Sequence, residues 1–204
     1  MKLLKLLLSF LLALSVFLAL NTKIDPLPPL GKFLSPNQGI WLNDVSEDNT
    51  EELSIKGLSA PVKVHYDKHL IPHVFAQNNL DLYRSQGYIT AKHRLWQMEF
   101  QTHASAGRLS EIVGSAALDY DRSQRRKGML FGAEKALENM QKDPEILGYL
   151  EAYRDGINSY IEPLSPSKYP VEYKLLDYAP EPWTLKKTAL LLMYMTDMLA
   201  GYET

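Results

Sequence analysis

The chain has 204 residues, of which 46% are hydrophobic, with a formal net charge of -2 and no cysteine. This composition is typical of a folded globular chain and excludes an intrinsically disordered one. The near-neutral charge gives no electrostatic basis for a nucleic-acid partner. The lack of cysteine excludes disulfides, thiolate metal sites and a cysteine nucleophile. The length suits one sizeable domain or part of a larger one.

The N-terminus is strongly apolar. Lys2 and Lys5 precede a mostly apolar run that ends at Leu20. A basic start followed by such a run is typical of a secretory signal, so we expect export. Two alternatives stay open: a cleaved signal peptide over residues 1–20, or a retained membrane anchor through residues 3–20. The protein is then periplasmic, or anchored in the membrane and facing the periplasm.

Residues 21–52 are predicted to be a linker. Four prolines and two glycines interrupt regular structure there, and residues 44–52 are acidic and polar. Such a spacer would carry a folded body, predicted to cover residues 53–204, away from a membrane.

Short strands are predicted at the start of this body. Residues 53–55 and 62–66 alternate apolar with polar side chains, and 73–76 is a third extended piece. Three histidines spaced by four residues lie here; on a helix they would form a metal-binding stripe. In a strand, four residues span about 13 Å. We therefore interpret His65, His69 and His73 as surface or packed residues, with His73 at a polar core or inter-chain position.

Helical spacing of apolar residues follows from residue 80 to the end. Residues 171–176 fit either a strand or a short helix. The fold class is α+β, mainly helical with a few N-terminal strands. We predict helices over residues 80–105 (with Gly107 as the stop), 108–113, 120–140 and 143–161, and from Leu185 onward.

Charged residues on these helices have ordinary structural interpretations. We expect a helix-terminal salt bridge between Arg108 and Glu111, and a pairing of Arg94 and Glu99 with buried charges of a partner chain. Metal binding by His93 or His103 is not expected, because they lie ten residues apart on one helix. A solvated helix face is expected for the mixed-charge cluster of Asp119, Asp121, Arg122, Arg125 and Arg126.

Six short motifs follow one another along the body. They are Asp67 with Ile71-Pro72-His73-Val74, Gly87-Tyr88 with Ala91, Arg94-Leu95-Trp96-Gln97-Met98, Gly107-Arg108-Leu109-Ser110-Glu111, Ala152 to Tyr160, and Pro182-Trp183-Thr184. In this order they resemble the opening of the penicillin acylase family of N-terminal-nucleophile hydrolases, over about residues 60–204. Leu70 replaces a glycine that is usual in the family, so the turn there is not expected to rely on a positive φ. His93 replaces a usual aspartate.

The resemblance implies an αββα fold and a precursor that cuts itself into a small and a large chain. The large chain begins with a serine, whose own α-amine can act as the base for its hydroxyl. This sequence corresponds to the small (alpha) subunit, so we assign no catalytic residue. The implied partner is the large (beta) subunit, or the C-terminal remainder of the same precursor. The alternative is a non-catalytic, membrane-anchored remnant or binding protein of the same fold.

The resemblance also implies a substrate and a site. The reaction is hydrolysis of a linear amide in a small acylated amine, such as a β-lactam with an acyl side chain or an N-acyl homoserine lactone. No organic cofactor is implied, and one structural calcium is implied, mostly bound by the large chain, with Glu203 as a candidate ligand. Met and aromatic side chains suit an adaptable apolar acyl pocket. The candidates for its wall are Met195, Met198, Leu199 and Tyr202.

Overall fold

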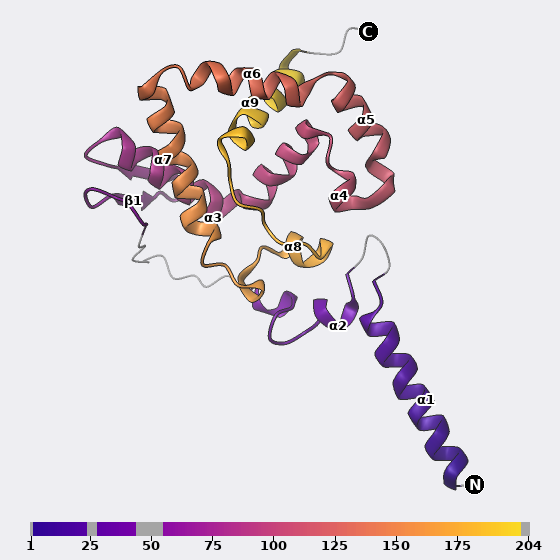
Figure 1. Ribbon diagram of the computed structural model, residues 1–204. Coiled ribbons are helices and arrows are strands. Elements are labelled where there is room, and N and C mark those ends of the chain that lie inside the picture. The colour runs from indigo at the N-terminus through magenta and orange to yellow at the C-terminus, as the bar shows by residue number, and fades with distance from the viewer. Residues whose placement is uncertain (1, 24–27, 44–54, 201–204) are drawn as a thin grey trace.

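The structure is a computed structural model that describes residues 2–23, 28–43 and 55–200 (Figure 1). Within these ranges the chain is mainly helical with one two-stranded sheet, which confirms the α+β class. The strands are β1 (Lys63–Tyr66) and β2 (Pro72–Phe75). The α-helices are α1 (Lys2–Asn21), α2 (Leu30–Phe33), α3 (Asn79–Ala106), α4 (Ser110–Val113), α5 (Leu118–Arg126), α6 (Met129–Met140), α7 (Pro144–Ile161), α8 (Val171–Leu176) and α9 (Leu185–Ala200). Three 3-10 turns are η1 (Ile40–Leu42), η2 (Gly114–Ala117) and η3 (Pro166–Lys168).

Two expectations for these elements need correction, and one open choice is resolved. Residues 120–140 do not form one helix, because Gly128 takes a left-handed conformation (φ 73°) that ends α5 and begins α6. Ile55 lies in no strand, while residues 53–54 lie outside the described residues. The open choice at residues 171–176 is resolved as the helix α8.

The two strands form an antiparallel hairpin in which His65 lies directly opposite His73. The spacing argument was therefore wrong for this pair, because the turn between the strands reverses the chain and brings the two histidines together. His73 is exposed rather than buried in this chain, and its Nε2 lies 3.5 Å from Asp67 Oδ2.

The framework of the body is the packing of α3 against α7. The two helices approach closely because Gly87 and Gly156 lie at their crossing. A Cβ atom on Gly87 would lie 2.2 Å from the Tyr153 carbonyl oxygen, and one on Gly156 would lie 1.9 Å from the Arg84 carbonyl oxygen. Only glycine therefore permits this contact between the helix backbones.

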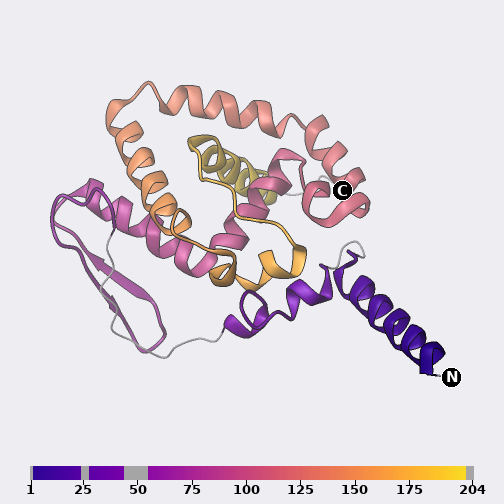
Figure 2. The same cartoon turned by 60° about the horizontal axis from the view of Figure 1, so that its bottom comes forward.

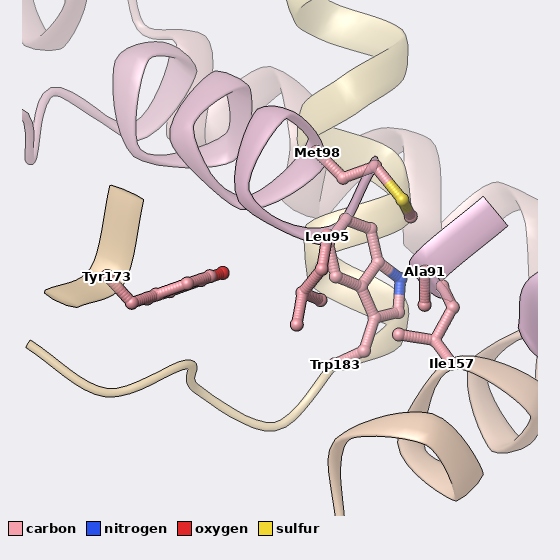
Figure 3. Close-up of a cluster of buried hydrophobic side chains, with 6 residues drawn as sticks. All are labelled: Ala91, Leu95, Met98, Ile157, Tyr173 and Trp183. Carbon is pink, nitrogen blue, oxygen red and sulfur yellow. The ribbon is translucent and has the colours of Figure 1, made fainter. Parts of the chain in front are cut away.

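The main core fills the space between α3, α7 and the segment that leads into α9 (Figure 3). Trp183 and Tyr173 are its largest side chains, and each is 1% exposed. Figure 3 shows Trp183 beside Leu95 and Ile157, with Tyr173 entering from α8 on the other side. The cluster contains Ala91, Leu95, Met98, Ile157, Tyr173 and Trp183.

Helix α9 lies inside a frame of helices, and it contacts α3, α6 and α7 (Figure 2). Its inner face forms a second cluster in which Ala189 and Ala133 are fully buried and Leu190 is 5% exposed. Small residues on both helices allow α6 and α9 to approach, and Met193 of α9 fills the space above Gly132.

Helix α1 projects away from the body in both views, and its residues are exposed throughout (Figures 1 and 2). It has a mean hydropathy of 2.5 and is the one helix among the described residues that is long and apolar enough to cross a membrane. Signal sequences share this property. Its two serines, Ser9 and Ser15, donate to backbone carbonyls one turn earlier, so their hydroxyls need no water.

The described part of the predicted linker is attached to the body. Asn43 Nδ2 donates to the Tyr169 carbonyl at 3.0 Å, and Lys174 Nζ donates to the Gly39 carbonyl at 3.0 Å and to Asn43 Oδ1 at 2.6 Å. Residues 28–43 therefore lie against the region of α8. The division of the chain at residues 20 and 52 stays a prediction.

Candidate functional site

Buried charges gather where α3 meets the segment before α9. The Glu99 carboxylate is 1% exposed, and its Oε1 accepts from Lys187 Nζ and from the Glu181 backbone N–H, each at 2.9 Å. Its Oε2 accepts from the Tyr173 hydroxyl. Because every oxygen of this carboxylate has a donor and its charge is paired, the burial of the pair is tolerated.

This cluster continues to the surface through Glu181. Arg108 donates to Glu181 at 2.8 Å and to Glu111 at 2.7 Å, which confirms the predicted helix-terminal salt bridge. The hydrogen bond from Arg108, and then the one from Lys187, lowers the pKa of Glu181 to about 2. The hydrogen bond with Glu111, and then the one with Glu181, raises the pKa of Arg108 above its usual range. Glu181 and Arg108 therefore both stay ionised at neutral pH.

His103 belongs to this cluster too. Ligand atoms of Glu99, His103 and Glu181 lie within 4.8 Å of one another, a geometry that could hold a metal ion. The Lys187 ammonium already lies 2.9 Å from Glu99 and 3.1 Å from Glu181, and so supplies the positive charge at this place. His103 Nδ1 lies 3.0 Å from the Glu99 carbonyl. We interpret the cluster as an internal salt-bridge network that ties α9 to α3.

One expectation is wrong here: Glu99 pairs within this chain, not with a partner chain. Arg94 is exposed and donates to Gln97 Oε1 at 3.0 Å. Sequence reasoning missed Lys187 and Tyr173. The signal for Lys187 was a lysine in the first turn of a helix that is otherwise mostly apolar.

The Pro182-Trp183-Thr184 motif is held by Asn158. The Trp183 N–H donates to Asn158 Oδ1 at 2.7 Å, and Asn158 Nδ2 donates back to the Trp183 carbonyl at 2.9 Å. The indole Nε1 donates to Thr188 Oγ1 at 3.0 Å. These contacts fix the direction in which α9 leaves the core.

Two buried aspartates hold loops by accepting from backbone N–H groups. Asp81 in the first turn of α3 binds Ser59 and Ala60, and the Ser59 hydroxyl above all lowers the pKa of Asp81 to about 2 despite its burial. Asp121 accepts from the N–H groups of Leu109 and Ser110, each at 2.8 Å. Asp121 is 3% exposed, so the solvated face expected for the charged cluster on α5 is wrong at this position.

Two departures from the family pattern also have structural outcomes. Leu70 takes a positive φ of 59°, so the hairpin turn does adopt the conformation that glycine usually provides, contrary to our expectation. His93 Nε2 lies 3.0 Å from the Tyr66 hydroxyl and joins the hairpin to α3. Burial, and then the neighbouring Lys92 and Arg94 charges, lower the pKa of His93.

The predicted pocket residues lie at the end of α9. Met195, Met198 and Leu199 are 48%, 60% and 78% exposed. Tyr202 and the candidate calcium ligand Glu203 lie outside the described residues. Together with Leu192, which is 43% exposed, the three α9 residues form an uncovered apolar surface. Their role in binding an acyl group stays a prediction.

Two clefts lie elsewhere on the body, and none of these α9 residues lines either of them. A cleft of about 380 Å³ lies between α2 and α8, lined by Phe33, Tyr169 and Tyr178 among others. A second cleft, of about 450 Å³, lies beside α7 and is lined by Tyr83, Tyr149 and other residues.

Comparisons with known proteins agree with this architecture. The family model described as penicillin amidase matches residues 61–204. A penicillin acylase 2 proenzyme from Pseudomonas sp. (strain SE83) is 41% identical over 64% of this chain, and an acyl-homoserine lactone acylase QuiP from Pseudomonas aeruginosa is 30% identical over 78% of it. A thermostable penicillin G acylase from Alcaligenes faecalis superposes with a TM-score of 0.62 and 26% identity, over 71% of this chain and 76% of that one.

The helical body and its motifs therefore define a fragment of an acylase fold, and the chain belongs to the penicillin amidase family. It spans 16% of the Pseudomonas sp. proenzyme and 19% of the P. aeruginosa acylase. The matched residues Glu99, Arg108 and Trp183 act in salt bridges and packing within this chain. The activity of the whole protein is therefore a separate question.

Proposed function

We propose that this chain is the small-subunit portion of an exported penicillin acylase-like amidase. The observation that carries the proposal is the superposition on the penicillin G acylase chain from Alcaligenes faecalis, because it covers about three quarters of that chain as well. The partner is then the large subunit, or the remainder of the same precursor. The uncovered face of α9 gives such a partner a surface to cover.

In this proposal the chemistry belongs to the remainder of the protein. A serine hydroxyl outside this chain attacks the amide carbonyl, with its own α-amine as base. An acyl-enzyme ester forms, the amine leaves with a proton, and water hydrolyses the ester to release the acid. The described chain contributes the framework of α3, α7 and α9, and the end of α9 contributes one wall of the acyl pocket.

The substrate is an acylated small amine. A β-lactam with an acyl side chain and an N-acyl homoserine lactone are both candidates, because relatives named for each activity match this chain. Helix α1 directs export, and it either is cleaved or stays as a membrane anchor. One structural calcium, with Glu203 as a ligand, is part of the same proposal.

Expression of the complete reading frame tests the proposal. We expect a large fragment whose N-terminal residue is serine, together with hydrolysis of at least one acylated amine from a panel of β-lactams and N-acyl homoserine lactones. Replacement of that serine by alanine must abolish both processing and hydrolysis. If the frame stops after Thr204, or if no serine-initiated fragment forms, the non-catalytic remnant is the better interpretation.

A further inference from the structure

The position of α2 relative to α1 is the starting observation. A helix of 20 residues is about 30 Å long, which matches the hydrocarbon thickness of a bilayer. Helix α2 contacts the C-terminal end of α1: a Cβ atom on Gly31 would lie 3.2 Å from the Leu20 carbonyl oxygen. If α1 crosses a membrane, α2 lies at the level where the hydrocarbon ends and the headgroups begin.

The segment at this level exposes apolar side chains. Leu30 and Leu34 are each 46% exposed, one helical turn apart, and in η1 Trp41 is 66% and Leu42 46% exposed. Trp41 lies on Leu34, because its indole Nε1 donates to the Leu34 carbonyl at 3.0 Å. Single exposed apolar residues are normal, but here four lie within 13 consecutive residues, and we call these four side chains the patch.

The segment that carries the patch is tied to the body. Gly39 allows the chain to fold back, because a Cβ atom there would lie 2.3 Å from the Phe33 carbonyl oxygen. Lys32 pairs with Asp177, and Lys174 binds the Gly39 carbonyl, so the segment is fastened to the loops around α8. Figure 1 shows α1 leaving the molecule beside α2, on the side of the body that carries α8.

We propose that residues 30–42 form an interfacial segment, which lies on the outer surface of the membrane and inserts Leu30, Leu34, Trp41 and Leu42 at the boundary between headgroups and acyl chains. Tryptophan is enriched at this depth, because its ring is apolar and its N–H is polar. Lys2 and Lys5 at the other end of α1 favour the cytoplasmic side, which places the segment outside. The proposal rests on the proposed insertion of α1.

The proposal has a consequence for orientation. Two points of contact, α1 and the interfacial segment, restrict the tilt of the body far more than one flexible tether does. The face of the body that carries α8 then lies toward the membrane, and the cleft between α2 and α8 lies close to the bilayer surface.

The lack of cysteine makes the test direct, because a single introduced cysteine carries the only label. Four variants of the 204-residue chain are labelled with an environment-sensitive fluorophore and reconstituted into vesicles of phosphatidylcholine and phosphatidylglycerol. Trp41→Cys probes the segment, Leu12→Cys probes the middle of α1, and Glu138→Cys is a water-facing control on α6 whose side chain is 58% exposed. Leu42→Cys repeats the probe with Trp41 intact, in case Trp41 is needed for local folding.

We expect the labels at positions 41 and 42 to emit at shorter wavelength than the label at 138, and to be quenched several-fold more by brominated lipids. The proposal fails if position 12 is quenched by lipid while positions 41 and 42 are quenched only by aqueous iodide; insertion of α1 then still stands. If position 12 is also open to iodide, α1 is not inserted; the membrane anchor and the interfacial segment then both fail, while the proposed amidase function still stands. If positions 41 and 42 are shielded from both quenchers, a protein surface covers them and the proposal is wrong.

Discussion

Leu70 occupies a backbone conformation that costs folding free energy. Its φ is 59°, and a residue with a Cβ atom pays about 1 kcal/mol or more in this region. Leu70 is 73% exposed, so burial of its side chain contributes little to the free energy of folding. We predict that Leu70→Gly raises the free energy of unfolding by about 1 kcal/mol, measured by urea unfolding of the chain in detergent. Ile71→Gly, at an exposed neighbour with ordinary φ, should instead destabilise; equal effects of the two changes would contradict the explanation.

The ionisation of Asp81 makes the free energy of unfolding depend on pH in the acid range. Its pKa is near 2 in the folded chain, below the ordinary 3.8, so the folded state favours the charged form. Its contribution is therefore present above pH 4 and is lost as the pH falls through 4 toward 2. We predict that Asp81→Asn lowers stability at pH 7 and flattens the stability curve between pH 4 and 2. An acid transition identical to that of the unmodified chain would show that other carboxylates dominate.

At the scale of elements, the crossing of α3 and α7 depends on two glycines. A Cβ atom at Gly87 or Gly156 would lie about 2 Å from a backbone carbonyl of the other helix, and backbone cannot yield as a side chain can. We predict that Gly87→Ala and Gly156→Ala each destabilise the chain by about 3 kcal/mol or prevent folding, measured by thermal unfolding.

Gly148 provides the matched control for this crossing. It lies on the same helix α7, but a Cβ atom there would only touch Leu80 Cδ2, at 3.7 Å. Gly148→Ala should therefore stabilise by about 0.5–1 kcal/mol through helix propensity. If it destabilises as much as Gly156→Ala, the cost comes from α7 itself and not from the crossing.

The pair Glu99–Lys187 joins α3 to α9 and lends itself to a double-mutant cycle. Lys187→Met leaves the Glu99 carboxylate buried without its cation, and we predict a loss of about 3 kcal/mol, measured by chemical unfolding. Adding Glu99→Gln to that variant removes the orphaned charge, so the double variant should be less destabilised than the sum of the two single changes. Strict additivity would mean that the two charges do not interact.

These elements also show how much of the fold can be predicted from the sequence. Apolar periodicity located α3, α7 and α9, because each buries one face against the body. It did not place the break at Gly128, since both flanking stretches keep helical spacing. The salt bridge of Arg108 with Glu111 is local in sequence and was predicted, whereas the Glu99–Lys187 pair spans 88 residues and depends on tertiary packing. In our proposal, a partner surface completes the pocket at the end of α9, and residues of this chain alone do not encode that surface.

At the scale of the whole molecule, α1 projects from one side of the body, and the outer face of α9 is uncovered elsewhere. The covered faces of α3, α7 and α9 form a closed core, while the outer face of α9 keeps Leu192, Met195 and Leu199 exposed. The i, i+3, i+7 spacing of these residues is that of a helix face made to be buried. The rest of the amidase is the partner that our proposal places there.

Leu199→Asp tests this placement in the complete precursor. Leu199 is 78% exposed in this chain, so the change should leave the folding of the small-subunit portion intact, as measured by circular dichroism. In the assembled enzyme it would bury an unpaired carboxylate against an apolar surface, which costs several kcal/mol. We therefore predict the loss of processed, assembled enzyme in size-exclusion chromatography. Leu118→Asp, at another exposed apolar residue at the start of α5, should leave assembly unchanged. Normal assembly of the Leu199 variant would mean that the partner does not cover α9.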